Sequence, residues 1–354
     1  MTSVFDHPWL DALFGDDDVS ELWSAPTQLE HFKAFEVALA EALEACGRVS
    51  PSVGRAAIEA ITIAEFDISA LADGTARDGL PIPSFARQLR AFAGPNSPAV
   101  HNGATSQDVL DTALALTLRE LTNILDHRIQ VLDGKLGEIV TLHGTRMLMG
   151  RTRMQAALPT TVSNRVEAWR RPLKSHLDGL AVLRPQVERL QLGGAVGDRA
   201  AFEPNAEEVA SRMAARLSLE NVPVWHTDRS SIADFAGRLS LISGTLGKMG
   251  QDVALMSQQG LDEIKLRGGG GSSAMPHKSN PINAELLVCL ARFNATLLAG
   301  MHQAMIHEQE RSGEAWMLEW MILPQMSVTT ARSLAVATLV CDEIEQIGMD
   351  AIRT

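Results

Sequence analysis

The chain of 354 residues contains no tyrosine, and aromatic side chains make up only 5% of it. Because aromatic residues are favoured in strands, and alternating polar and apolar patterns are also scarce here, the sequence favours helices over sheet. Its cysteines are limited to Cys46, Cys289 and Cys341, so a disulfide framework is not expected.

Long apolar runs are missing as well. No stretch of about 18 uninterrupted apolar residues occurs, so we expect no membrane span. The first residues show no basic segment followed by an apolar block, so we expect no secretory signal and place the protein in the cytoplasm. The net charge of -12 argues against non-specific binding to nucleic acid.

Hydrophobic residues make up 45% of the chain, which is ample for a large core and for two or three domains. The clearest helix follows Asp111, where one apolar stripe continues for roughly 45 Å at 1.5 Å per residue. Its members recur at spacings of three and four residues: Leu114, Leu118, Leu121, Leu125, Ile129, Leu132, Leu136 and Ile139.

Other long helical patterns cover residues 162–192, 231–261, 283–310 and 324–347, and a shorter one covers 28–46. Helices of this length suit a bundle. We therefore predict an all-α fold, with an N-terminal helical domain at residues 1–105 and a central long-helix bundle at residues 106–354.

A run of four glycines leads into the segment Gly271-Ser-Ser-Ala-Met-Pro-His-Lys-Ser-Asn-Pro281. Consecutive glycines resist a single conformation, so residues 262–282 are predicted to act as a catalytic lid. Lys278 can hold a carboxylate, Asn280 can donate hydrogen bonds to it, and Ser272 or Ser273 can exchange a proton with a neighbouring carbon. The alternative is a flexible linker before a helix.

This segment closely resembles the fingerprint of the fumarase/aspartase superfamily. Two further segments resemble the superfamily's other shared regions, in the expected chain order: His101-Asn-Gly-Ala-Thr105-Ser106-Gln-Asp108 and Gly150-Arg151-Thr-Arg153-Met-Gln155. The resemblance implies a homotetramer whose active sites combine regions from different subunits. Members usually continue into a small C-terminal helical domain, which we expect to be missing or truncated here.

The resemblance also implies site residues. Ser272 is expected to donate the proton at carbon, while Lys278 and Asn280 hold the negative charge that develops on a carboxylate. Thr105 and Ser106 are expected to bind another carboxylate. His101, Arg151, Gln155, Arg229 and Arg311 complete the expected site, with no metal and no cofactor.

Arg153 departs from the superfamily pattern, because many of its lyases have histidine at this position as general acid for the leaving group. Arginine gives up no proton at neutral pH, but it binds a carboxylate in a fork. A carboxylate departs as an anion without needing a proton. The sequence therefore resembles the branch that closes a lactone within a tricarboxylate, 3-carboxy-cis,cis-muconate, and the runs around Arg229 and Arg311 favour the same branch.

Other interpretations remain open. The chain could instead cleave a carbon–nitrogen bond, as in adenylosuccinate, or could be a non-catalytic helical oligomer. Each arginine taken singly is more often a solvated ion pair, and His101 could be structural. Trp316 and Trp320, one helical turn apart, suit packing as well as a substrate wall.

Overall fold

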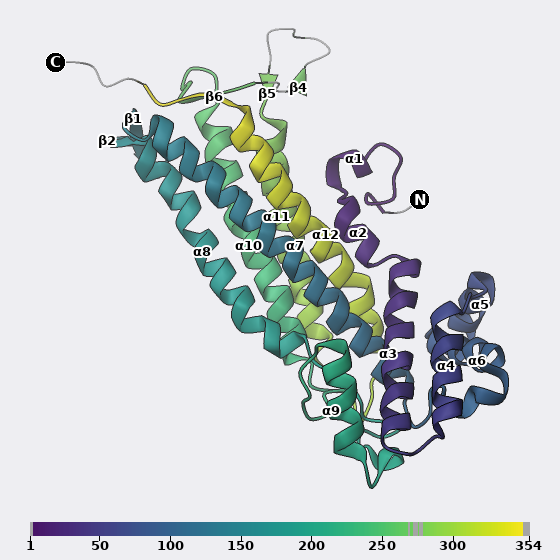
Figure 1. The fold of residues 1–354 in the computed structure, drawn as a ribbon. Helices are drawn as coiled ribbons and strands as arrows, with labels where there is room; N and C mark the ends of the chain where they lie inside the picture. Colours follow the sequence, from purple (N-terminus) through teal and green to yellow (C-terminus); the bar gives the residue numbers. More distant parts are fainter. Residues whose placement is uncertain (1–2, 268–269, 272–274, 276–278, 350–354) are drawn as a thin grey trace.

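The computed structural model describes residues 3–267, 270–271, 275 and 279–349. Within this part of the chain, five long helices lie side by side (Figure 1). They are α7 (Ser106–His143), α8 (Val162–Val187), α10 (Ser230–Met256), α11 (Ile282–Gln303) and α12 (Glu314–Glu343). The predicted all-α bundle is confirmed.

Helix α7 forms along the predicted apolar stripe. Leu118, Leu125 and Leu132 are fully buried against the neighbouring helices. The helix begins at Ser106, earlier than the stripe alone indicates, because the carboxylate of Asp108 accepts the backbone N–H of Thr105 at 2.9 Å and caps the first turn.

Helix α12 begins at Glu314, ten residues before the predicted start at 324. The prediction was wrong because proline usually stops a helix, whereas Pro324 lies inside this one. The hydrogen bond that Pro324 cannot donate would have gone to the carbonyl of Trp320, four residues earlier in the same helix.

The N-terminal helices are α1 (Asp11–Phe14), α2 (Asp17–Leu22), α3 (Ala25–Ala45), α4 (Pro51–Ile63), α5 (Ile68–Asp78) and α6 (Ile82–Ala93), followed by the 3-10 turn η1 (Gly94–Ala99). Helix α3 agrees with the pattern predicted at 28–46. Helix α2 packs on the bundle through Val19 and Leu22.

A second hydrophobic core joins α3–α6, the start of α7 and a segment from the middle of the chain. That segment contains η2 (Ala200–Phe202) and α9 (Ala206–Leu217), and α9 packs on α3. The domain boundary at 105/106 stays a prediction, but the unit around α3 clearly includes residues from beyond it.

Strands in the described residues form three small antiparallel pairs. Strands β1 (Met147–Thr152) and β2 (Gln155–Thr161) make a hairpin, β3 (Ile264–Leu266) pairs with β6 (Ile344–Ile347), and β4 (Gly270–Gly271) pairs with β5 (Ser279–Asn280). The hairpin was not predicted, because β1 does not alternate between buried and exposed residues.

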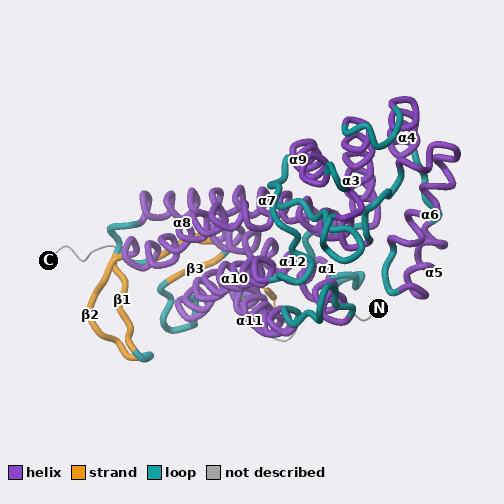
Figure 2. Tube along the Cα trace, turned by 90° about the horizontal axis from the view of Figure 1, so that it is seen from below, coloured by secondary structure: helices purple, strands orange, loops and turns teal. Residues whose placement is uncertain are grey.

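The bundle therefore has two distinct ends (Figures 1 and 2). The α9 end carries α3–α6, α9 and the first turn of α7. The hairpin end carries the β1–β2 hairpin and the β3–β6 pair. Helix α7 has 38 residues, so these ends lie about 57 Å apart at 1.5 Å per residue.

Candidate active site

His101 and Glu36 form a close pair at the α9 end. The imidazole Nδ1 lies 2.7 Å from Oε1 of Glu36, and the backbone N–H of His101 donates to Oε2 of the same carboxylate at 2.7 Å. Glu36 lies on α3 and its side chain is fully buried. His101 has a φ of 52°, which side-chain-bearing residues rarely adopt.

Thr105 and Ser106 lie half-buried at the start of α7, where the helix dipole favours anions. The buried carboxylate of Asp108 holds this turn in place. Besides capping Thr105, it accepts the backbone N–H groups of Gly193 at 2.7 Å and Gly194 at 2.9 Å. The Nε2 atom of His226 lies 2.9 Å from its Oδ1.

Arg229 lies in the core rather than on a substrate surface. Its guanidinium donates to both oxygens of Glu319 at 2.9 and 2.6 Å, and to Asp111 at 2.9 Å. Its residue exposure is 2%, and it also stacks over the ring of Trp225. The expected substrate contact of Arg229 is therefore corrected to a structural role, since all its nitrogens already donate to buried partners.

Burial and neighbouring charges act on Arg229 and Glu319 in opposite directions. Burial disfavours a charged guanidinium, but the attraction of Asp111 and Glu319 raises the pKa of Arg229 above its usual value. For the carboxyl of Glu319 burial has the larger effect and raises its pKa, although the charge of Arg229 acts to lower it. Nearby, burial and then the charge of Arg229 lower the pKa of His307, which favours a neutral imidazole.

Arg311 supplies an exposed cation at the α9 end. Its Nε donates to Oε1 of Gln107 at 3.2 Å, and one terminal nitrogen donates to the carbonyl of Ala195 at 3.2 Å. Gln107 is itself buried and donates to the carbonyl of His226. Arg311 is thus anchored beside Thr105 and Ser106 on the same end of the bundle.

Arg151, Arg153 and Gln155 lie on the hairpin at the other end. Arg151 pairs with Glu263 at 3.2 Å. Thr152 is paired with Gln155, so Arg153 and Met154 form a two-residue turn, with φ of 49° and 67°. These angles fit a type I′ turn, which usually takes Asn-Gly. The Arg153 side chain is exposed at this turn.

Asn280 also lies at the hairpin end, where it pairs with Gly270. It lines a cavity of about 340 Å³ together with Ser257, Asp262, Lys265 and Gln346, among others. Ser272 and Lys278, the other principal residues of the predicted lid, lie outside the described residues, as does Ser273.

Within one chain, the predicted site residues therefore lie in two groups. His101, Thr105, Ser106 and Arg311 lie at the α9 end, whereas Arg151, Arg153, Gln155 and Asn280 lie at the hairpin end. Since α7 spans about 57 Å between them, the groups cannot act on one small substrate within a single chain.

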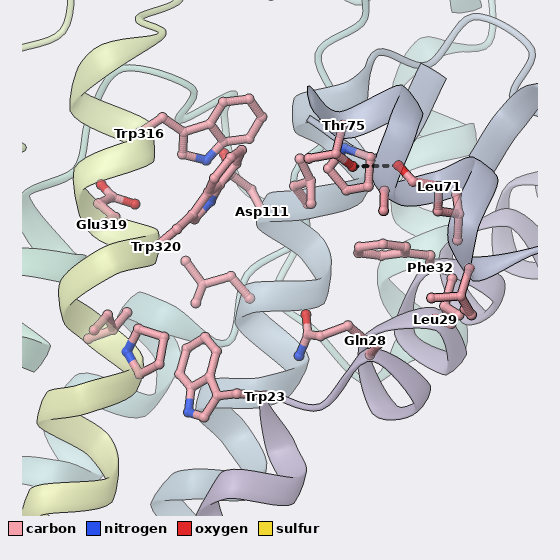
Figure 3. Close-up of a pocket in the computed structure, with 18 residues that line it drawn as sticks. Trp23, Gln28, Leu29, Phe32, Leu71, Thr75, Asp111, Trp316, Glu319 and Trp320 are labelled. Atoms are coloured by element: carbon pink, nitrogen blue, oxygen red, sulfur yellow. Dashed lines mark hydrogen bonds between the residues drawn. The ribbon is translucent and has the colours of Figure 1, made fainter. Parts of the chain in front are cut away.

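A cavity of about 550 Å³ lies between the N-terminal helices, α7 and α12 (Figure 3). Its walls are mainly apolar and include Trp23, Phe32, Trp316 and Trp320. Its charged residues, Asp111 and Glu319, are both acidic. It therefore does not suit a tricarboxylate, and the predicted site does not lie there.

Three residues of the α9 end were missed from the sequence: Glu36, Asp108 and His226. Asp108 had a readable signal, because it stands three residues after Thr105 and before an apolar stripe. Glu36 stands within the buried stripe of α3, where an acidic residue requires a partner. For metals, the described ranges hold no group of three potential His, Cys, Asp or Glu ligands.

A family model described as lyase matches residues 27–293. The 3-carboxy-cis,cis-muconate cycloisomerase of Acinetobacter baylyi is 36% identical over 91% of this chain and 74% of that protein. The enzyme of the same name from Pseudomonas putida is 36% identical over 97% of this chain and 82% of that protein. The N-acetyl-S-(2-succino)cysteine lyase of Enterococcus italicus is 31% identical over 94% and 74%.

Solved structures agree with these matches. The crystal structure of 3-carboxy-cis,cis-muconate lactonizing enzyme from Pseudomonas putida aligns with a TM-score of 0.90 at 32% identity. The alignment covers 96% of this chain and 77% of that one.

The buried cluster generates a stability prediction. Arg229→Met leaves Asp111 and Glu319 without their cation, and we expect it to lower the free energy of unfolding by about 3–5 kcal/mol. Chemical denaturation at fixed protein concentration measures this. Arg212→Met is the control, because Arg212 pairs with Glu208 on the surface and its loss should change the free energy of unfolding little. Equal effects for both variants would contradict the structural role.

Proposed function

The chain belongs to the lyase family of the fumarase/aspartase superfamily, and from that membership we propose that it cyclises 3-carboxy-cis,cis-muconate to 4-carboxymuconolactone. This reaction belongs to the protocatechuate branch of aromatic-compound breakdown, the beta-ketoadipate pathway. The similarity supports the reaction class. The observation that selects the substrate is Arg153, a fixed cation at the turn of an exposed hairpin.

In this reaction one carboxylate oxygen attacks a carbon of the conjugated diene and forms the ring C–O bond. The π electrons move to the neighbouring carbon, which takes up one proton, so the product is an isomer of the substrate. The transition state places extra negative charge on the carboxylate conjugated to that carbon. Donors directed at this carboxylate lower the barrier most.

The residues divide between these tasks. Ser272 transfers the proton, and Lys278 and Asn280 hold the charged carboxylate, as their positions in the fingerprint indicate. Thr105 and Ser106 bind another carboxylate at the start of α7, beside Arg311. Arg151, Arg153 and Gln155 hold the carboxylate that attacks, and Arg153 contributes charge without giving up a proton.

We propose that the protein is a cytoplasmic homotetramer whose sites combine the α9 end of one subunit with the hairpin ends of others. The separation of the two groups of residues within one chain supports this. So does α11, since only 33% of its most apolar window of 18 residues is buried. By length and composition such a helix could also span a membrane, but α11 packs between α10 and α12.

Turnover tests the proposed reaction directly. Closing the ring removes one double bond from a conjugated system, so we expect near-ultraviolet absorbance to fall when the protein is added to 3-carboxy-cis,cis-muconate. Adenylosuccinate, argininosuccinate, fumarate and N-acetyl-S-(2-succino)cysteine serve as comparison substrates. Brisk cleavage of one of these without any lactonisation would replace the proposal, and inactivity towards all of them would favour a structural protein.

Arg153→Met tests the carboxylate contact. Since arginine binds the carboxylate in both the ground state and the transition state, we expect KM to rise about 10- to 100-fold while part of kcat remains. Arg153→His should not restore binding at pH 8, because a neutral imidazole supplies neither the charge nor the fork. Steady-state kinetics would contradict this role if Arg153→His were fully active at pH 8.

Subunit mixing tests the shared sites. His101→Gln alters the α9 end and Asn280→Ala alters the hairpin end, so each homotetramer should be nearly inactive. After subunit exchange some sites receive intact residues from both ends, and part of the activity should return. Two preparations of the same variant, mixed in the same way, are the control. A monomer in light scattering would rule out the assembly.

A further inference from the structure

The contact between Glu36 and His101 at the α9 end bears on how the reaction is catalysed. We propose that Glu36 is a positioning residue that fixes the tautomer and orientation of His101, so that Nε2 faces the carboxylate-binding turn at Thr105 and Ser106. The proposal rests on the proposed function only for the role of that turn. The contact between Glu36 and His101 stands by itself on the geometry.

Glu36 uses both of its oxygens on one residue. Oε1 lies 2.7 Å from Nδ1 of His101, and Oε2 accepts the backbone N–H of the same residue at 2.7 Å. A carboxylate only accepts, so a neutral imidazole in this contact must carry its proton on Nδ1. The lone pair of Nε2 then remains available. In the described part of the chain, no hydrogen bond to Nε2 is found, and this atom is not among the buried unpartnered ones.

The same two bonds determine where the ring points. His101 has a φ of 52°, and its carbonyl accepts a hydrogen bond from Arg90 at 3.1 Å. The residue is therefore held on its N–H, its carbonyl and its ring at once. Side chains in functional sites need such support, because small errors in orientation weaken their contacts. Glu36 is fully buried, so water does not compete for the carboxylate.

The chemistry follows from this arrangement. His101 lies four residues before Thr105 in the same loop, and Gly103 between them has a φ of 81°. With Nδ1 occupied, Nε2 accepts a proton when neutral and donates to a substrate carboxylate when protonated. Glu36 balances the imidazolium charge in the second case. Histidines in enzymes are commonly held in this way by a carboxylate that never touches the substrate.

Glu36→Gln tests the proposal with little change in size. An amide replaces one of the two acceptor oxygens with an NH₂ donor, so either the ring Nδ1–H or the backbone N–H loses the oxygen that it contacts in the wild type. We expect kcat for 3-carboxy-cis,cis-muconate to fall about tenfold or more, with a smaller change in KM. Glu36→Asp keeps the charge and both acceptors, and should recover part of the activity. Glu41→Gln is the matched control, since Glu41 lies on the same helix and pairs with Arg216 at the surface.

A spectroscopic measurement separates positioning from mere support of the fold. In the full-length protein with ¹⁵N-labelled histidine, ring signals of His101 are assigned by their loss in His101→Gln. At a pH where the ring is neutral, we expect a protonated Nδ1 in the wild type and in Glu36→Asp, and a shift towards protonated Nε2 in Glu36→Gln. An unchanged ring signal in a folded Glu36→Gln protein would overturn the proposal.

A double-mutant cycle gives an independent answer. If Glu36 acts through His101, then Glu36→Gln should cause no further loss of activity in a His101→Gln background. A further loss of tenfold would overturn the proposal. Should Glu36→Gln fail to fold, the ring signals of Glu36→Asp decide, and an unprotonated Nδ1 there would count against it. If the wild type does not lactonise the substrate, the proposed function fails while the ring spectra still test the pair.

Discussion

The buried ion pairs of Arg229 with Asp111 and Glu319 are the constraint on which the α9 end depends. They join α7, the start of α10 and α12, and Gln107 and Gln191 both donate to the same oxygen of Asp111. Burying such charges contributes little net stability, because desolvation offsets much of the attraction. Their main effect is to fix how the three helices lie relative to one another. Gln107 then positions Arg311, which places the exposed cation beside the first turn of α7.

A net charge of -12 is compatible with the anionic substrate that we propose, because Arg311 and Arg153 are exposed at the two ends of the bundle. Arg229 is already neutralised in the core, so it adds no field for the substrate. In the assembly that we propose, a different subunit completes the surroundings of Arg311 at one end and of Arg153 at the other. In that proposal the length of α7 links the catalytic arrangement to the assembly.

Much of the fold could be predicted because its signals are local. The apolar stripe from Leu114 to Ile139 depends only on spacing along the chain, and the fingerprint around Asn280 is continuous in sequence. The role of Arg229 could not be predicted, because its partners lie 118 and 90 residues away. The hairpin was missed since Arg153 and Met154 are not the residues that normally mark a type I′ turn.

Glu36 shows what a sequence signal can and cannot supply. An acidic residue among Phe32, Phe35 and Leu39 on the buried face of a helix must find a donor, since an unpaired charge there would be very costly. The sequence therefore indicates that a partner exists, yet His101 lies 65 residues away and only the fold identifies it. Through this contact the N-terminal helices are tied to the loop that leads into α7. The unit around α3 thus takes part in positioning the site as well as covering the end of the bundle.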